Sequence, residues 1–314
     1  MKELALFLLI LADLPVAARS LPAADPEAKI PFKLYGGYTI VARGSIAGLN
    51  HLNFIIDTGA VPSVVDLKVA RKLRLQGQVE PLSLFSQTIE TRRVTLPGLE
   101  LGPIDTGPLQ VIVGDLASFE SRLGVRVDGM IGLDVLARQD FVVDYESGTI
   151  AFGTAPGNAR GPLDPAGTSV PFELGPGYAV VSLDVERQPF GLMVDTAARS
   201  LFLFAPRVRD RLAGLRKLSE RVIGNEGGAV ALMEVVLPNA SLDTVPLNAQ
   251  RAALMEGQAP ASVDLDGLLG TRSLGVRRLG FDFEHRAMTW ARCVLASRPS
   301  AGRYFWSHPH PQAI

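Results

Sequence analysis

The 314-residue sequence contains a single cysteine, Cys293, so it cannot form an internal disulfide. It also lacks an excess of either charge, because 31 Lys and Arg residues nearly balance 32 Asp and Glu residues. Nucleic-acid-binding proteins normally carry a basic excess, so we expect no nucleic-acid partner. No apolar run reaches the roughly 20 residues that a membrane-spanning helix needs, so we expect no membrane span in the mature chain.

Several familiar catalytic signatures are missing as well. The sequence has no G-x-S-x-G, no Walker loop and no H-E-x-x-H. Of its four histidines, His308 and His310 stand in a Pro-containing C-terminal stretch, whereas a zinc site requires three or four ligands on a rigid frame. We therefore expect no metal and no cofactor, and we assign Cys293 no chemistry.

The composition favours a folded, mostly-β protein. Hydrophobic residues make up 47% of the sequence and charged residues 20%, which suits a packed core and excludes wholesale disorder. The 31 glycines and 22 prolines favour short strands joined by turns over a helical bundle. The length suggests about two domains.

The N-terminus has the parts of a secretory signal peptide. Lys2 precedes the apolar run Leu4–Ala12, and the small residues Val16–Ala18 follow. We expect cleavage after Ala18, with a site near Ala24 as the second choice, and hence an exported protein, periplasmic or secreted from a bacterium. The alternative is that these residues form a buried N-terminal helix.

The sequence contains an internal repeat. Three landmarks of the first half recur 138 residues later in the second half, and three echoes at a single offset indicate a duplication. The paired segments are Phe54–Ala60 with Leu192–Ala198, Asp128–Gly132 with Asp266–Gly270, and Val143–Glu146 with Phe281–Glu284.

The repeat predicts a chain of two similar lobes. We expect a signal peptide over 1–18, an N-terminal lobe over 30–152 and a C-terminal lobe over 168–293. A linker rich in Gly and Pro spans 153–167, and residues 294–314 form a tail.

Each lobe contains an apolar strand that leads into an Asp-Thr loop. If a pseudo-twofold axis relates the lobes, Asp57 and Asp195 face each other, and two carboxylates about 3 Å apart share one proton. The ionised carboxylate can then take a proton from water while its partner donates a proton to a peptide carbonyl. The residues of the two loops are Asp57, Thr58 and Gly59, and Asp195, Thr196 and Ala197.

These loops and the Asp128–Gly132 element resemble the aspartic protease superfamily, specifically the bacterial retropepsin-like proteins. The resemblance implies two pseudo-symmetric pepsin-like β-barrel lobes with a few short helices. It also implies an aspartic endopeptidase acting on polypeptide substrates without a cofactor, with Asp57 and Asp195 as the catalytic residues. Thr58, Gly59, Thr196 and Ala197 would support the loops.

Ala197 departs from the family pattern, which has Gly at this position. If the position needs a positive φ, an alanine strains the loop. One alternative is therefore a catalytically silent peptide- or partner-binding protein on the same fold. In another, two chains each donate Asp57, but the duplication already supplies a second lobe, so we expect a monomer.

Further local expectations follow from the sequence. Asp105–Gly107 also spells Asp-Thr-Gly, but Pro103 and Pro108 flank it, so it is interpreted as a surface turn. Phe141–Phe152 is expected to form a hairpin turning at 147–148. Helices are expected to span 66–75 and to begin at Pro206 and reach Leu215, and flap hairpin tips are expected near 224–228 and, less clearly, near 86–92. Alanines at 60 and 198, where pepsin-like enzymes often have a hydroxyl, predict a mildly acidic activity optimum.

Overall fold

The computed structural model describes residues 10–11, 29–83, 88–153, 168–175, 177–212, 214–225, 228–247, 249–257 and 264–292. Most of the expected signal peptide, most of the linker, the whole 294–314 tail, Cys293, His308 and His310 lie outside these residues. Among the described residues, no helix is long and apolar enough to cross a membrane.

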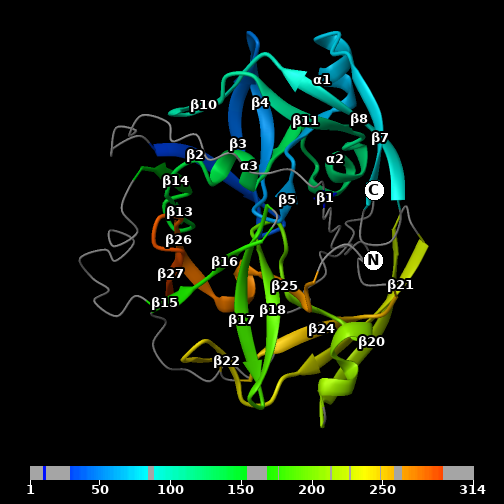
Figure 1. Ribbon diagram of the computed structural model, residues 1–314, viewed down its shortest axis with the longest axis vertical. Helices are drawn as coiled ribbons and strands as arrows, with labels where there is room; N and C mark the ends of the chain where they lie inside the picture. The colour runs from blue at the N-terminus through cyan, green and yellow to red at the C-terminus, as the bar shows by residue number, and fades with distance from the viewer. Residues whose placement is uncertain are drawn as a thin grey trace, which may run out of the picture.

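The described chain is mostly β, with a few short helices, as predicted (Figure 1). One sheet has 17 strands and consists of the first-lobe strands together with β15, β26 and β27. A second sheet has ten strands, β16 to β25, and belongs to the second lobe. The first-lobe strands are β2 (Lys29–Tyr35), β3 (Thr39–Ile46), β4 (Leu49–Ile56), β5 (Ala60–Val61), β6 (Val64–Asp66), β7 (Gly77–Ser83), β8 (Thr88–Leu96), β9 (Leu99–Leu101), β10 (Ile104–Asp105), β11 (Leu109–Gly114), β12 (Gly129–Ile131), β13 (Phe141–Asp144) and β14 (Thr149–Phe152).

The second lobe repeats this order of elements. Its strands are β15 (Thr168–Pro171), β16 (Glu173–Leu174), β17 (Ala179–Val185), β18 (Gln188–Asp195), β19 (Leu201–Phe204), β20 (Arg216–Asn225), β21 (Gly228–Val236), β22 (Ala240–Leu242), β23 (Val245–Leu247), β24 (Arg251–Met255), β25 (Gly267–Gly270), β26 (Val276–Asp282) and β27 (Ala287–Arg292). The helices are α1 (Leu67–Lys72), α2 (Ala117–Leu123), α3 (Leu133–Leu136), α4 (Ala205–Val208) and the 3-10 turns η2 (Arg209–Arg211) and η3 (Thr271–Leu274).

Six strands join the two lobes in a shared sheet. Their order is β2, β14, β13, β26, β27 and β15, so each lobe contributes three strands. At its centre Val142 pairs with Gly280, and on either side Phe141 pairs with Phe281 and Val143 with Leu279. This register places the pseudo-twofold axis between Val142 and Gly280, because residues equally far from that pair occupy equivalent positions in the repeat.

Aromatic side chains pack along this shared sheet. The rings of Phe141 and Phe281 stack at a centroid distance of 4.9 Å, and those of Phe281 and Phe283 lie 6.0 Å apart. Phe141, Phe152 and Phe281 are fully buried. Burial of large aromatic surfaces at this seam stabilises the junction of the lobes, and so fixes the two Asp-Thr loops relative to each other.

The local predictions are confirmed in part. The hairpin β13–β14 turns at Gly148, whose φ of +65° suits glycine. Helix α1 begins at the Asp66 N-cap, as predicted, but ends at Lys72 and not at residue 75. The predicted second helix is shorter than expected: α4 and η2 end at Arg211. Of the predicted first-lobe tip, residues 88–92 belong to strand β8 instead, and residues 86–87 lie outside the described residues.

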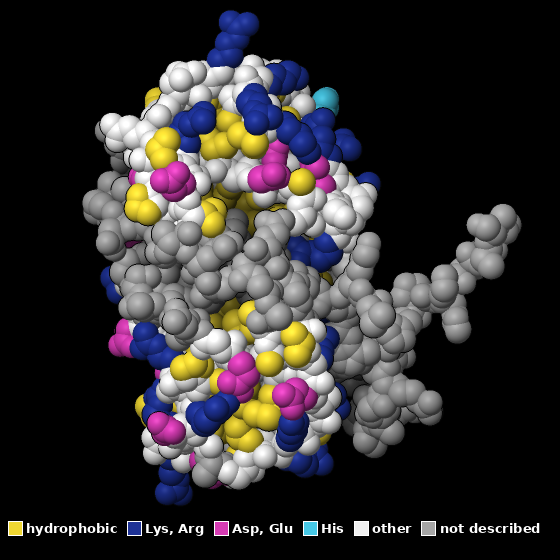
Figure 2. Space-filling model, turned by 90° about the vertical axis from the view of Figure 1, so that its right-hand side faces the viewer, with side chains coloured by type: hydrophobic (Ala, Val, Ile, Leu, Met, Phe, Trp, Pro, Cys, Tyr) yellow, Lys and Arg dark blue, Asp and Glu magenta, His cyan; other side chains and the backbone are white. Residues whose placement is uncertain are grey.

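Both lobes carry a long hairpin, β7–β8 in the first lobe and β20–β21 in the second. The two hairpins lie on the same side of the molecule (Figure 1). On that face, basic, acidic and apolar side chains are interspersed over both lobes (Figure 2). Val79 on β7 and Val222 on β20 are each 67% exposed, so neither outer strand is covered there by described residues.

Candidate active site

The two Asp-Thr loops meet where the lobes join. Asp57 follows β4, and Asp195 is the last residue of β18. Both carboxylates are almost fully buried, at 4% and 5% exposure, and the two side chains are hydrogen-bonded to each other. The structure thus brings together the two aspartates that the sequence singles out.

The two threonines lock the loops across the lobe boundary. The Thr58 hydroxyl donates to the Val194 carbonyl at 2.8 Å and accepts from the Thr196 N–H at 3.1 Å. The Thr196 hydroxyl donates to the Ile56 carbonyl at 3.0 Å and accepts from the Thr58 N–H at 3.1 Å. The sequence predicted loop braces at these positions, and the structure shows that each threonine braces the opposite lobe.

The Asp-Gly elements fix the two strands that lead into Asp57 and Asp195. The Asp128 carboxylate accepts the Asn53 N–H at 2.9 Å, and Asp266 accepts the equivalent Gly191 N–H at 3.0 Å. The following strands, β12 and β25, run parallel to β4 and β18. In the first lobe the Asp57 N–H donates to the Ile131 carbonyl at 2.9 Å. Each aspartate loop is therefore fixed by a strand that the repeat motif supplies.

The backbone donors differ between the two carboxylates. Oδ1 of Asp57 accepts the Gly59 N–H at 2.8 Å. Oδ1 of Asp195 accepts two N–H groups, from Ala197 at 2.8 Å and from Ala198 at 2.7 Å. Hydrogen bonds donated to a carboxylate favour its charged form, so the Asp195 loop is the better host for the negative charge.

The pKa values of the two carboxylates reflect this difference in backbone donors. Burial raises the pKa of Asp57 well above its usual value, and the neighbouring Asp195 charge raises it further. Burial also raises the pKa of Asp195, to about 6, while the Ala198 and Ala197 N–H groups and the hydrogen bond from Asp57 oppose the rise. When the pair carries a single proton, Asp57 therefore holds it and Asp195 carries the charge.

Ala197 causes no backbone strain. Neither Gly59 nor Ala197 is among the described residues that have a positive φ. Its N–H makes the same hydrogen bond to Asp195 that the Gly59 N–H makes to Asp57. The Ala197 side chain packs, half-buried, against an apolar cluster of the first lobe that includes Ile55 and Met130.

Gly59, in contrast, has no room for a side chain. A Cβ atom at this position would lie 3.0 Å from Cγ of Asp195 and 3.1 Å from Cε of Met193. These distances are tighter than normal van der Waals contacts. An added methyl group at position 59 would therefore make Asp195 or Met193 shift by a few tenths of an ångström, so glycine suits this position through the close approach of the opposite carboxylate and not through its φ angle.

Sequence reasoning missed two polar contacts near the loops. The Ser63 hydroxyl donates to Asp134 at 2.7 Å and accepts the Gly132 N–H at 2.9 Å, which ties β12 to the Asp57 side of the site. The hydroxyls of Tyr145 and Thr271 lie 3.1 Å apart and bridge the lobes. Both pairs lie next to segments of the repeat, but the repeat does not mark them. The apolar residues Leu201 and Phe283 occupy the second-lobe positions equivalent to Ser63 and Tyr145.

The second Asp-Thr-Gly is a turn, as interpreted from sequence. Asp105 is exposed and its carboxylate accepts the Gly107 N–H at 3.0 Å, while the Thr106 hydroxyl accepts the Leu99 N–H. No group of three or more His, Cys, Asp or Glu side chains is arranged to hold a metal ion within the described ranges.

The N-terminal strand β1 (Ile10–Leu11) lies beside the Asp57 loop. Its backbone pairs in parallel with Ala60–Val61, directly after Gly59, and Leu11 pairs antiparallel with Ser83 at the end of β7. An extended segment therefore fits between the Asp57 loop and the first-lobe hairpin.

The match to a protein family agrees with this geometry. Residues 42–135, which contain Asp57 and the Asp128–Gly132 element, match the aspartyl protease family. No curated protein matches the sequence. Among solved structures, the chain is similar to basic 7S globulin from soybean, with 13% identity and a TM-score of 0.47, over 84% of this chain and 94% of that one.

Proposed function

We propose that the chain, of which residues 42–135 match the aspartyl protease family, is an aspartic endopeptidase whose two catalytic carboxylates come from one chain. The observation that carries this proposal is the buried, hydrogen-bonded pair Asp57 and Asp195 with its unequal backbone donors. A pair of this kind holds one proton and one charge, which acid–base hydrolysis by water requires.

The unequal donors assign a role to each carboxylate. Asp195, with two N–H donors, is the base: it takes a proton from the attacking water, whose oxygen bonds to the peptide carbonyl carbon. Asp57 is the acid and gives its proton to the carbonyl oxygen. The proton on Asp195 then passes to the amide nitrogen as the C–N bond breaks, and the hydroxyl of the intermediate returns a proton to Asp57, which restores the starting state.

An extended polypeptide is the proposed substrate. The backbone pairing of Ile10–Leu11 with Ala60–Val61 and with Ser83 supports this, because a strand can lie between the loop and the hairpin using main-chain hydrogen bonds. Binding by main-chain pairing accepts many sequences, so side-chain pockets along the strand would set preference.

The geometry of Ala197 weighs against the silent binding protein considered from sequence. Its N–H still donates to Asp195, and its φ angle does not need glycine. We also propose that one chain suffices, because the Thr58 and Thr196 hydrogen bonds already join two loops of the same chain.

The proposal is tested by cleavage of an unstructured protein. Asp57→Asn and Asp195→Asn should each lower the cleavage rate at least a hundredfold, since general acid–base groups contribute factors of about 10² to 10⁴. Asp105→Asn, in the surface Asp-Thr-Gly, is the matched control and should leave the rate unchanged. Saturable binding of a peptide without cleavage, in folded wild type from pH 3 to 8, would instead identify a silent binding protein. A rate that falls faster than linearly on dilution would indicate that two chains form the site.

We further propose that the chain is exported, to the periplasm or outside the cell, with residues 1–18 as the leader. The apolar run Leu4–Ala12 and the small residues before position 19 support export. N-terminal sequencing of the protein recovered outside the cytoplasm should begin at residue 19. Recovery only of intact chain in the cytoplasm would contradict export.

A further inference from the structure

A pair of hydroxyl groups joins the two lobes next to the strand that supports Asp195. Tyr145 directly follows β13 of the first lobe, and Thr271 directly follows Gly270, the last residue of β25, in the second lobe. Their hydroxyl oxygens lie 3.1 Å apart, and Thr271 is fully buried. Gly270 is the ladder partner of Asp195. The hydroxyl pair therefore connects the first lobe with the strand beside one carboxylate of the proposed pair.

Gly270 also lies against the backbone of the Asp195 loop. A Cβ atom at position 270 would lie only 2.4 Å from the Ser200 carbonyl oxygen and 2.7 Å from that of Ala198. The Gly270 N–H donates to the same Ser200 carbonyl at 3.1 Å. The Ala198 N–H in turn donates to the Asp195 carboxylate at 2.7 Å. Because Gly270 is packed this closely, its displacement would move a hydrogen-bond donor of that carboxylate.

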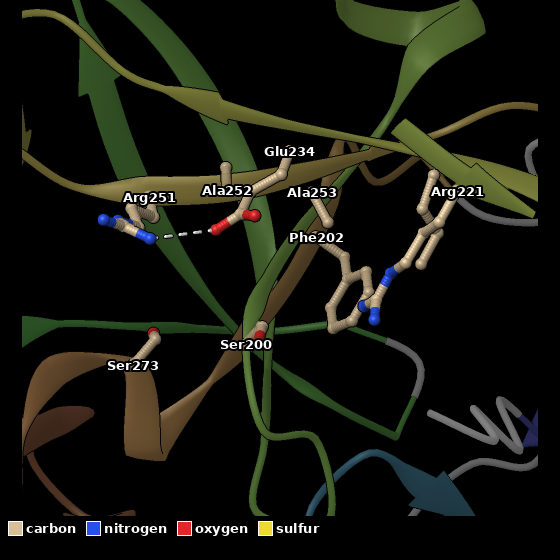
Figure 3. Close-up of a pocket in the computed structure, with 9 residues that line it drawn as sticks. Ser200, Phe202, Arg221, Glu234, Arg251, Ala252, Ala253 and Ser273 are labelled. Atoms are coloured by element: carbon tan, nitrogen blue, oxygen red, sulfur yellow. Dashed lines mark hydrogen bonds and ion pairs between the residues drawn. The ribbon is translucent and has the colours of Figure 1, made fainter. Parts of the chain in front are cut away.

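The turn that follows Gly270 is closed by a hydrogen bond of its own. The Ser273 hydroxyl donates to the Gly270 carbonyl at 2.6 Å. Figure 3 shows Ser273 with Ser200, where the two serines line one side of a small pocket next to this turn. Thr271 lies between Gly270 and Ser273, so a bond to the Thr271 hydroxyl restrains the position of Gly270.

The Tyr145 side chain is held by contacts from both lobes. The Arg272 guanidinium of the second lobe lies over its ring at 4.8 Å, which is a cation–π contact. The ring of Phe32 packs edge-on against it at 6.1 Å. The Tyr145 N–H donates to the Arg277 carbonyl at 2.9 Å. None of these contacts uses the hydroxyl, so a phenylalanine at 145 would lose the bond to Thr271 and keep the packing.

The repeat does not reproduce this hydroxyl pair on the other side of the site. By the offset of 138 residues, Phe283 is equivalent to Tyr145 and Leu133 is equivalent to Thr271. Neither Phe283 nor Leu133 has a hydroxyl group, so these positions cannot form the same bond beside Asp57. The pair thus supports the carboxylate to which the proposed mechanism gives the base role.

We infer that Tyr145 is a positioning residue for Asp195, because through Thr271 it holds Gly270 against the Asp195 loop. The inference rests on the proposed function and adds a residue to it. Burial raises the pKa of Tyr145, and the nearby Asp195 charge acts in the same direction, against Thr271 and Arg272. The hydroxyl therefore keeps its proton at acidic and neutral pH, and Tyr145 acts through its position and not through titration.

The inference is tested by steady-state kinetics of peptide cleavage as a function of pH. Tyr145→Phe should lower kcat about tenfold and leave KM within about twofold, because a misplaced catalytic group affects the chemical step more than binding. The rise of kcat/KM with pH should move to higher pH by about half a unit, because a displaced Ala198 N–H favours the charged form of Asp195 less. Thr271→Val should have the same two effects, and Thr271→Ser, which keeps the hydroxyl, should restore most of the rate.

A control variant and a double variant isolate the bond between the lobes. Thr149→Val removes an exposed hydroxyl bond, to Ser147 at 2.8 Å, within the β13–β14 hairpin, and should keep the wild-type kcat, KM and pH profile. Tyr145→Phe combined with Thr271→Val should be no slower than either single variant, because all three lack the same bond. Fully additive losses would contradict the inference.

The outcomes separate this inference from the proposed function. Failure of folded wild type to cleave any peptide would overturn the proposed function. Wild-type kinetics and pH profile in Tyr145→Phe and Thr271→Val would leave the protease intact and overturn the positioning role. A lower rate that only matches a loss of folded protein, with an unchanged pH profile, would overturn it too. If Tyr145→Phe does not fold, the difference between Thr271→Val and Thr271→Ser decides the question.

Discussion

The two Asp-Thr loops of this chain make the same interlobe hydrogen bonds but place different atoms around their carboxylates. Thr58 and Thr196 exchange equivalent bonds, with matching distances of 3.1 Å for the N–H donors. Gly59, however, leaves space for Asp195, whereas Ala197 presents a methyl group to the first-lobe cluster. In the proposed mechanism, this combination of equivalent interlobe bonds and different surroundings assigns the acid role to Asp57 and the base role to Asp195.

The asymmetry between the two loops is tested most strongly by substituting the residue at the third loop position, Gly59 or Ala197. Gly59→Ala should lower kcat/KM about a hundredfold, because its methyl group displaces the Asp195 carboxylate and small misplacements of catalytic groups have effects of this size. Ala197→Gly should stay within about twofold of wild type, because the N–H to Asp195 is kept. Equal effects of the two substitutions on peptide cleavage would contradict the asymmetry.

The interlobe hydrogen bonds of Thr58 and Thr196 can be tested through the stability of the protein. Thr58→Val should lower the free energy of unfolding by about 1 to 3 kcal/mol, because it leaves the buried Thr196 N–H and Val194 carbonyl without their partner. Thr196→Val should have a similar effect for the same reason. Urea unfolding measures both, with Thr58→Ser as the control that keeps the hydroxyl. A loss confined to one of the two variants would show that the braces are unequal.

The raised pKa of Asp195 carries a stability consequence. The folded state holds a proton that the unfolded state releases between pH 3.8 and about 6, so stability falls as the pH rises through this window. At pH 7, Asp195→Asn should therefore be more stable than wild type, by on the order of 2 kcal/mol. Near pH 4 the two should differ little in urea unfolding. A wild-type stability that does not change from pH 4 to 7 would be inconsistent with the buried pair.

The smallest expected effect concerns the N-terminal strand. Because β1 lies between the Asp57 loop and the end of β7, it competes with a substrate for that place. A chain that begins at residue 19 should cleave peptides several-fold faster than the full chain. A synthetic peptide of residues 4–18 should inhibit the shorter chain competitively. Equal rates for the two chains would show that the strand does not obstruct the site.

Much of this architecture could be predicted from the sequence because the duplication left a constant offset. The offset of 138 residues paired Asp57 with Asp195 and Asp128 with Asp266. The structure hydrogen-bonds the first two aspartates to each other and gives Asp128 and Asp266 equivalent backbone contacts. Apolar runs before the Asp-Thr motifs identified the strands that carry them. A constant offset between motifs therefore identifies residues that occupy equivalent positions in the fold, even from a single sequence.

The remainder depends on contacts that local patterns do not encode. Whether position 59 needs glycine depends on its backbone and on the Met193 and Asp195 side chains of the opposite lobe, which sequence spacing cannot place. Only the strand registers show that Arg93 of the first lobe is equivalent to Glu234 of the second, and that Glu80 is equivalent to Arg221. The β13–β26 pairing that joins the lobes likewise links residues far apart in the chain, where no motif marks the partner.

The most direct test of the account is the pH dependence of kcat/KM for peptide cleavage by wild type and by Asp195→Asn. The account predicts that wild-type activity rises with pH through about 6, as Asp195 ionises while Asp57 keeps its proton, and that the variant is inactive across the range. This places the optimum on the mildly acidic to neutral side. Full activity of Asp195→Asn, or a wild-type optimum near pH 2, would contradict it.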